Sequence, residues 1–418
     1  MSLSAKAAGA VVRLLVVVLL FALPSAALAA GYIITAPLKG KCRPDLPSCT
    51  PFYQWMTPVI AGDYVVFTTR NGPPDAVWSY RISTKKLRKL AGIGTKVPGG
   101  KGNFTAISDL GSDYQTTIGG TVAAFFGRDE NNTLGLYTVS VQGGEITRIV
   151  TTKTNVPGTT EKFTNLSRAS TNGETIAFWG MRASNISGIY KASVDGTNRK
   201  RVIDSTQPLD ARGASGPQPD YFNIFSRPTI GKTYVQFQAG GLFDPSTGAN
   251  AIFRARNGSF IDIADNRTLL LGGTPGQHVR IGADSAAVGG NAIAFSADEP
   301  NTGFSGVFIA RTEGDYGEPF VTTKDNAPNG RKFVQFMGFG YDKTGLVVTA
   351  VYKIAGGGTN QGIFCVSVAG NPPVQVAVNG DKYYLPEVGD RSTTDRGYVV
   401  FKDGGNFAET FYLAKPNP

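Results

Sequence analysis

A glycine followed by an apolar segment that ends near phenylalanine recurs seven times along this 418-residue chain. The copies read GDYVVF, GTVAAF, GETIAF, GKTYVQF, GNAIAF, GLVVTA and GYVVF, at intervals of 51 to 59 residues. The sixth copy is degenerate, because Ala350 stands where the others have phenylalanine. A repeat of this length indicates equivalent supersecondary units that stack on one another, not one continuous core.

Each copy contains further strand-like segments. A second strand follows a polar loop in every copy: AVWSY, LGLYTV, SGIYKA, ANAIFRA, SGVFIA, QGIFCV and ETFYLA. A third strand follows in six copies, and a fourth element precedes each glycine: FYQWM, NFTAIS, KFTNLS, YFNIFS, HVRIG, KFVQFM and KYYLP. Apolar and β-branched residues bounded by Gly, Pro and Asn are typical of strands and hairpins. The sequence therefore predicts four antiparallel strands per copy and no helix of useful length.

Four-stranded units repeated in a ring predict an all-β fold, a seven-bladed β-propeller, because radial closure leaves only short edges exposed. The seventh copy ends at Pro418 without an outer strand, and residues 32–36 have the pattern to supply it. Six blades plus a separate cap is the alternative, since copies six and seven are the weakest. We expect residues 30–51 to hold the closing strand and a disulfide loop, and residues 52–418 to form the propeller.

Residues 1–29 predict export. Lys6 and Arg13 precede an apolar run of about ten residues, which is short for a bilayer core of roughly 30 Å. Ala27-Leu28-Ala29 fits a cleavage site before Ala30. An uncleaved anchor is the alternative. We expect a mature protein that is secreted, or periplasmic in a bacterium, monomeric and without a transmembrane segment.

The charge balance favours anionic partners. Removal of the leader takes two basic residues from 41, which leaves 39 basic against 31 acidic residues, a net charge of +8. Such a balance suits a polysaccharide, a lipid headgroup or a nucleic acid. Export makes nucleic acid the least expected of the three, so we expect an acidic polysaccharide or an extracellular protein as partner.

The three cysteines fall into two groups. Cys42 and Cys49 bracket a short loop, and in an oxidising compartment we expect them to form a local disulfide. Cys365 lies within the apolar pattern GIFCV, which predicts a buried small hydrophobic residue. A reactive thiol is the alternative for Cys365, and it would need an accessible, electropositive setting.

The segment SRASTNGETIAFWG, followed by SGIYKASVDGTNRKRVI, resembles the repeat of TolB-type propellers. In that repeat a serine-rich turn with glycine precedes an apolar strand ending in Phe, then an Ile-Tyr strand and an Asp-Gly turn, here Asp195-Gly196. The order of motifs is also similar to secreted tandem-repeat proteins of bacteria. The resemblance covers residues 52–414 and is good only in copies two and three. It implies the fold but no function, because propellers host unrelated activities.

Catalytic signatures are scarce. His278 is the single histidine, and no Gly-x-Ser-x-Gly elbow is present. Zinc and copper sites need several His or Cys ligands, so we expect no metal site of that kind and no cofactor. The acidic pairs Asp129-Glu130 and Asp298-Glu299 could bind calcium, but we favour solvated loops between strands. Two facing carboxylates for glycoside hydrolysis remain open, because spacing cannot be tested from sequence.

The fourth elements suggest one candidate site. When they are aligned on their first apolar residue, the flanking positions face away from the core. If these elements are the innermost strands, that face lines the central channel. The candidate ligand-binding residues are then Lys162, Tyr221, His278, Arg280, Lys332 and Lys382, interleaved with Tyr53 and Tyr384. The alternative is a solvated rim with no specific role, and a slip of one residue would turn every side chain to the other face.

Such a ring would suit an acidic glycan, since Lys and Arg hold carboxylate or sulfate groups. We expect first a non-catalytic binding or interaction module. The second hypothesis is a polysaccharide lyase or glycoside hydrolase at the channel mouth, in which the lyase would use Tyr221 or His278 as base. The third is a structural protein of the cell envelope.

Overall fold

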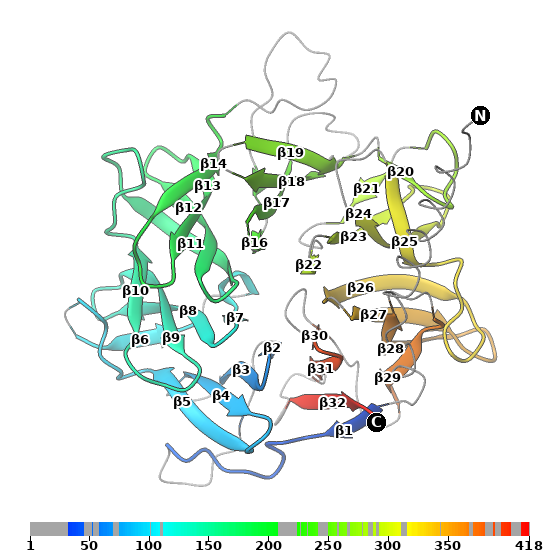
Figure 1. Cartoon of the computed structure of the whole chain (residues 1–418), viewed down its shortest axis with the longest axis horizontal. Coiled ribbons are helices and arrows are strands. Elements are labelled where there is room, and N and C mark those ends of the chain that lie inside the picture. Colours follow the sequence, from blue (N-terminus) through cyan, green and yellow to red (C-terminus); the bar gives the residue numbers. More distant parts are fainter. Residues whose placement is uncertain are drawn as a thin grey trace, which may run out of the picture.

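The computed structural model describes most of the chain from residue 32 onward. The described residues are 32–45, 52, 58–69, 75–100, 102–108, 112–207, 224–225, 227–231, 233–240, 250–256, 259–265, 268–277, 279–282, 287–289, 292–310, 316–342, 344–367, 371–380, 388, 394–402 and 411–417. They form seven β-sheets arranged around one axis (Figure 1). The chain is a seven-bladed β-propeller, so the expected blade number is confirmed and the six-blade alternative is wrong. Within these residues, no helix is long and apolar enough to cross a membrane.

Each blade is a sheet whose strands run in chain order from the axis outward, except at the outermost strands of blades 5 and 7. The first three blades consist of β2 (Val59–Ala61), β3 (Tyr64–Thr69), β4 (Ala76–Arg81) and β5 (Lys86–Gly92); β6 (Phe104–Ile107), β7 (Thr117–Gly119), β8 (Val122–Asp129), β9 (Leu134–Ser140) and β10 (Thr147–Thr151); and β11 (Phe163–Thr171), β12 (Thr175–Arg182), β13 (Ser187–Ser193) and β14 (Lys200–Asp204).

The remaining blades follow the same plan. Blades 4 and 5 consist of β15 (Ile224–Phe225), β16 (Thr229–Ile230), β17 (Val235–Gly240), β18 (Asn250–Arg256) and β19 (Ser259–Ala264); and β21 (Arg280–Ile281), β22 (Ala287–Gly289), β23 (Ala292–Asp298), β24 (Ser305–Ala310) and β25 (Tyr316–Thr322), with β20 (Leu269–Leu270) parallel to β25. Blades 6 and 7 consist of β26 (Phe333–Tyr341), β27 (Gly345–Lys353), β28 (Thr359–Ser367) and β29 (Val374–Val378); and β30 (Thr394–Asp395), β31 (Tyr398–Phe401), β32 (Tyr412–Pro416) and β1 (Tyr32–Thr35).

The N-terminal strand closes the ring, as expected from residues 32–36. β1 pairs antiparallel with β32, and the sheet order β30-β31-β32-β1 joins one N-terminal strand to three C-terminal ones (Figure 1). The Tyr32 hydroxyl also donates a hydrogen bond to Cys365 Sγ of blade 6 over 3.0 Å. The two ends of the chain therefore hold the last blade together.

The innermost strand of a blade has two halves. In blades 2, 4 and 5 it is split, so that β6 and β7, β15 and β16, and β21 and β22 each pair with one long neighbour. In β11 and β26 the halves are continuous, and a bulge stands between them. The first halves correspond to the segments that precede each repeat glycine, which were predicted from the sequence as the fourth element of each copy. The second halves lie nearer the axis, where β7, β11 and β16 contact one another in turn (Figure 1).

The core lies between blades. Each pair of neighbouring blades buries its own apolar cluster, and the cluster between blades 2 and 3 contains Phe126, Leu136 and Ile176. A trio of rings recurs within blades and explains the phenylalanines of the repeat. In blade 3 the Phe163 ring stands edge-on to Phe178 and Tyr190, at centroid distances of 6.0 and 4.9 Å. Such ring pairs add stability beyond the area they bury.

The glycine of the repeat serves a turn. Gly62, Gly120, Gly173 and Gly397 each precede the second strand of a blade and have φ between +54° and +95°. Side chains disfavour this left-handed backbone, and glycine adopts it at no steric cost. The recurrent glycine of the repeat therefore marks the turn from the inner strand to its neighbour.

Candidate functional site

The residues of the sequence-predicted ring divide into described and undescribed ones. Lys162, Arg280 and Lys332 are described and exposed. The other candidates lie outside the described residues: Tyr221, His278 and Lys382, together with Tyr53 and Tyr384. Their neighbours Phe104, Phe163, Val279 and Phe333 are at most 3% exposed, which confirms that the first apolar residue of each element faces the core.

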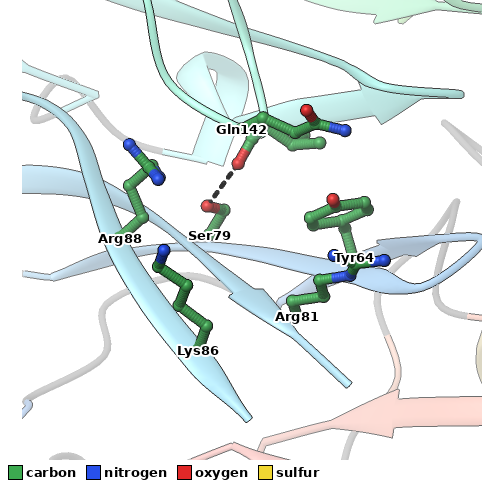
Figure 2. Close-up of a pocket in the computed structure, with 7 residues that line it drawn as sticks. Tyr64, Ser79, Arg81, Lys86, Arg88 and Gln142 are labelled. Carbon is green, nitrogen blue, oxygen red and sulfur yellow. Dashed lines mark hydrogen bonds between the residues drawn. The ribbon is translucent and has the colours of Figure 1, made fainter. Parts of the chain in front are cut away.

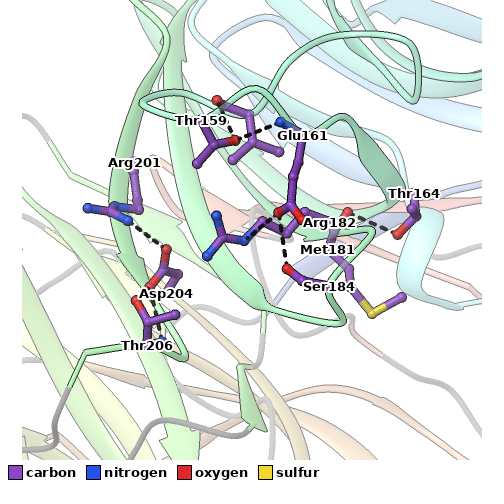
Figure 3. Close-up of polar contacts among 10 residues, drawn as sticks. Thr159, Glu161, Thr164, Met181, Arg182, Ser184, Arg201, Asp204 and Thr206 are labelled. Atoms are coloured by element: carbon purple, nitrogen blue, oxygen red, sulfur yellow. Dashed lines mark hydrogen bonds and ion pairs between the residues drawn. The ribbon is translucent and has the colours of Figure 1, made fainter.

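Lys162 and Lys332 belong to a repeated loop that leads from one blade into the next. Lys162 forms a β-bridge with Asn155, and Lys332 forms the corresponding bridge with Asn326. The adjoining side chains tie the loop to its own blade: Glu161 forms an ion pair with Arg182 over 3.1 Å and accepts a hydrogen bond from Ser184 (Figure 3). The backbone role of the bridge explains why these two lysines occupy equivalent places.

The three described ring residues make their contacts close to their own positions in the chain, Arg280 within its blade and the two lysines within their loops. Arg280 forms a bidentate pair with Asp298 of β23, at 2.9 and 3.1 Å. Lys332 donates to the carbonyl of Lys324. No contact in the described part of the chain joins one of the three cations to another, so a shared ligand at these residues stays a prediction.

The two acidic pairs hold loops. Asp129 accepts hydrogen bonds from the backbone amides of Asn131 and Thr133, and Glu130 accepts one from the amide of Asn103. Glu299 accepts the amide hydrogen of Thr274. The carboxylates of Asp129 and Glu299 are buried, which differs from the solvated loops that we favoured. No group of three His, Cys, Asp or Glu side chains comes together among the described residues.

Cys365 is a buried free thiol, as expected. Burial raises its pKa to about 12, and the hydrogen bond from Tyr32 opposes that shift only in part. The thiol therefore stays protonated and unreactive at neutral pH. Cys42 is not among the free cysteines of the described residues, and Cys49 lies outside them, so the Cys42–Cys49 pairing stays a prediction.

A pocket of about 250 Å³ lies between blades 1 and 2, at the end of the sheets where the outer hairpins turn. Its lining residues are Tyr64, Ser79, Arg81, Lys86, Arg88, Val141 and Gln142. Figure 2 shows Arg81, Lys86 and Arg88 gathered on the strands of blade 1, beside the turn of blade 2 that carries Gln142. Ser79 donates a 2.7 Å hydrogen bond to the carbonyl of Val141, which fixes the two blades against each other below the pocket.

Arg81 is held in place by Asp63. Its Nε lies 2.7 Å from Asp63 Oδ2, and its guanidinium lies 5.7 Å from the centre of the Tyr64 ring. Partial burial on its own would raise the pKa of Asp63, but the hydrogen bonds from Ser83 and Arg81 outweigh it and lower that pKa. The carboxylate is therefore charged at neutral pH and neutralises about one of the three cations.

Lys86 and Arg88 provide the excess charge. Both stand on β5 and are exposed, and neither side chain forms a hydrogen bond or ion pair with the described residues. A Cβ on Gly143 would lie only 2.9 Å from Arg88 Cδ and Nη1, so the Arg88 side chain lies against the backbone of the blade 2 turn. Three cations and one adjacent carboxylate give the site a net charge of about +2, which favours an anionic ligand.

The fold itself does not demand this charge. In the registers of blades 2, 3 and 6, serines stand in the place of Arg81: Ser140, Ser193 and Ser367. The place of Arg88 is taken by other residue types, namely Thr147, Lys200, Ile261, Glu318 and Val374 in blades 2 to 6. Blade 4 has an arginine in the place of Arg81, Arg256, but it combines it with Ile261. Among the described residues of blades 1 to 6, only those of blade 1 combine an arginine at the first place with a cation at the second.

A sequence signal for this site existed. Blades 2, 3 and 6 share Ser-Val-x-Gly at the outer hairpin, as SVQG, SVDG and SVAG, whereas blade 1 reads RISTKKLRK. The repeat is defined by the residues that the copies share, so this departure of blade 1 is not part of its pattern. Its five cations form the densest basic stretch of the described chain.

Comparisons with known proteins show what fold this chain has and do not show its function. No family model matches the sequence, and no curated protein matches it. Among solved structures, the chain is similar to an oligogalacturonate lyase from Vibrio parahaemolyticus, with 11% identity, 92% of this chain and 97% of that chain covered, and a TM-score of 0.52. The β-propeller domain of the Trilobed protease from Pyrococcus furiosus has 10% identity, coverages of 88% and 94%, and a TM-score of 0.51.

An acylaminoacyl peptidase is similar at 10% identity and a TM-score of 0.51, over 87% of this chain. The present chain spans about half of that peptidase, 51% of its length. Identities this low show a shared fold alone. The β-propeller fold that the TolB-type resemblance implied is confirmed by the seven sheets.

Proposed function

We propose that this chain is an exported, non-catalytic binding module whose pocket between blades 1 and 2 holds an acidic group of a polysaccharide. The observation that carries the proposal is the combination of Arg81, Lys86 and Arg88 around one pocket, two of them without a side-chain partner in the described chain. Export is part of the proposal and rests on the leader pattern of residues 1–29, which lie outside the described residues.

The size of the pocket favours one unit of a polymer. Sites that enclose a whole small-molecule ligand occupy about 300–1,000 Å³, and this pocket of about 250 Å³ is smaller. One acidic sugar unit would enter it while the rest of the chain stays outside. Arginine binds carboxylate and sulfate through two parallel hydrogen bonds, which gives the site a geometric preference for planar or tetrahedral oxyanions.

The lining of the pocket favours binding over cleavage. Glycoside hydrolysis needs two carboxyl groups about 5–10 Å apart across the bond to be cleaved. The seven lining residues include no carboxylate, and the adjacent Asp63 is engaged by Arg81 and Ser83. A lyase or hydrolase therefore enters as an outcome of the test below.

Retention on immobilised polymers tests the proposal. The mature protein should bind polygalacturonate and a sulfated polysaccharide, and should not bind dextran. Loss of the charge-assisted hydrogen bonds of one arginine costs about 1.5–3 kcal/mol, so Arg88→Ala should weaken binding at least ten-fold. Lys200→Ala changes the equivalent cation of blade 3 and should leave binding unchanged.

Three results would contradict the proposed binding function or its location. New reducing ends in the polygalacturonate digest would make the protein an enzyme. Binding that survives Arg88→Ala but is lost in Lys332→Ala or Arg280→Ala would move the site to the ring predicted from sequence. Equal binding of anionic lipid vesicles and of polysaccharide would show a general anion surface without preference for sugars.

A further inference from the structure

A short segment of blade 2 connects four blades near the axis. This segment, Asp113–Thr116, follows the first half of the inner strand and is called the clasp below. Thr116 Oγ1 lies 2.8 Å from Thr68 Oγ1 of blade 1. The Tyr114 ring packs edge-on against Phe126 of its own blade, at 5.3 Å, and its hydroxyl donates to Asn165 Oδ1 of blade 3 over 3.3 Å.

Two arginines from neighbouring blades bind the clasp. Arg168 Nε lies 3.0 Å from Asp113 Oδ1, and Arg227 Nη1 donates a 2.6 Å hydrogen bond to Gln115 Oε1. The two arginines are equivalent by sequence, because each follows a serine just before the inner half of its strand, in SRAST and SRPTI. Asp113 and Gln115 are two residues apart, so their Cα atoms lie within about 7 Å of each other. Both arginines therefore reach the same short segment of blade 2.

The backbone at Arg168 is unusual. Arg168 has φ of 53° and lies in the bulge of β11 between Ser167 and Ser170. Non-glycine residues rarely adopt this left-handed conformation, and where they do the strain often accompanies function. β26 also has a bulge, one residue earlier along the strand, between Phe336 and Gly338, and it contains Met337, whose side chain is exposed. A bulged inner strand therefore occurs in this fold without an arginine.

We propose that Arg168 and Arg227 form a carboxylate-binding site near the axis, which the Asp113 carboxylate occupies until an external carboxylate displaces it. Asp113 already shows the geometry that such a group would adopt on Arg168, and its side chain is 44% exposed, so it can leave without opening the core. Tyr114 stays anchored by Phe126, so the clasp releases Asp113 while the segment keeps its place. The ligand class is a small compound with two or more carboxylates. This site is separate from the pocket between blades 1 and 2.

Calorimetric titration with citrate, a tricarboxylate, tests the site in the mature protein. The titration uses the Arg81→Ser and Arg88→Thr background, so that the pocket does not contribute and the two proposals can fail independently. Asp113→Asn removes the internal competitor and should tighten citrate binding about ten-fold. Addition of Arg168→Gln should abolish that gain. Glu161→Gln alters a comparable ion pair, between Glu161 and Arg182, in the loop between β10 and β11 and should change nothing.

A second variant keeps the test valid if Asp113→Asn loosens the ring and lowers the Tm. Gln115→Glu adds a carboxylate opposite Arg227 without removing a contact, and it should weaken citrate binding about five-fold. Citrate affinity that is unchanged in both variants would overturn the proposal and leave the clasp a purely structural tie between blades. Tightening in Asp113→Asn that persists after Arg168→Gln would overturn it as well.

Discussion

Blades 1 and 3 have the same framework and differ at their outer hairpins. Phe67 and Trp78 of blade 1 pair across strands in the same register as Phe178 and Tyr190 of blade 3, and a left-handed glycine precedes both pairs. At the hairpin, the positions of Arg81 and Arg88 in blade 1 correspond to those of Ser193 and Lys200 in blade 3. Packing between neighbouring blades constrains the buried residues that close the ring, whereas the exposed residues of the outer hairpin can differ between blades without loss of the fold. This difference is the basis on which we propose the binding role for blade 1.

The largest effect should come from the framework that the two blades share. Phe178→Ala removes a fully buried ring that contacts Phe163 and Tyr190, and loss of such a ring costs about 3–5 kcal/mol of unfolding free energy. Denaturant unfolding measures the loss. Polygalacturonate binding at a temperature where the variant is folded should be unchanged, and a parallel loss of binding in the folded variant would break the separation between framework and hairpin.

A second effect should be confined to binding. The double variant Arg81→Ser and Arg88→Thr gives blade 1 the residues that blade 2 has at the same places, Ser140 and Thr147. The loss should be about 3 kcal/mol of binding free energy, roughly a hundred-fold in Kd. Because both positions are exposed, the free energy of unfolding should change by no more than about 0.5 kcal/mol. A stability loss as large as the binding loss would show that the cations serve the fold.

The reverse exchange should produce a smaller gain. Ser193→Arg places an arginine on blade 3 beside Lys200, with Glu174 in the place that Asp63 has in blade 1. An added surface cation contributes about 1 kcal/mol at most, so binding to a sulfated polysaccharide should tighten by no more than about five-fold. Val374→Arg in blade 6 is the matched control for added charge. An equal gain in both variants would mean that charge alone, without a neighbouring cation, determines binding.

The smallest expected effect concerns pH. Hydrogen bonds from Ser83 and Arg81 outweigh partial burial and lower the pKa of Asp63, so this carboxylate supports the native state above its ordinary pKa near 4 and loses that effect as the pH falls through the lowered value. Protonation there also stops the neutralisation of Arg81. Binding of a sulfated polysaccharide should therefore strengthen two- to three-fold only as the pH falls through this lowered pKa, and not near the ordinary pKa of an aspartate. Asp63→Asn should bind with the stronger affinity at all pH values, and an unchanged pH profile in that variant would contradict this role of Asp63.

The framework was predictable from sequence because each of its signals is local and repeated. The turn glycine, the Phe of the second strand and the Gly-Ile-Tyr type of third strand recur in most of the seven copies, at intervals of 51 to 59 residues. Residues 32–36 complete the seventh blade. The sites were less predictable for two physical reasons. The pocket joins Arg88 to a turn of the next blade, a contact that no single repeat contains. Alternation along β5 also sends Arg88 to one side and Lys89 to Asp45 on the other, so a basic run in the sequence does not reveal which cations converge.

The location of the ligand is tested most directly by hydrogen exchange with and without bound polygalacturonate oligomer. Residues 79–90 and 141–145 contain six of the seven residues that line the pocket, and their backbone amides should exchange more slowly in the complex. Equivalent hairpin amides of blade 3, residues 190–201, should exchange at the same rate in both states. Protection confined to residues 103–105, 162–164 and 332–334, with none at the outer hairpins of blades 1 and 2, would contradict the pocket and place the ligand at the ring of loops predicted from sequence.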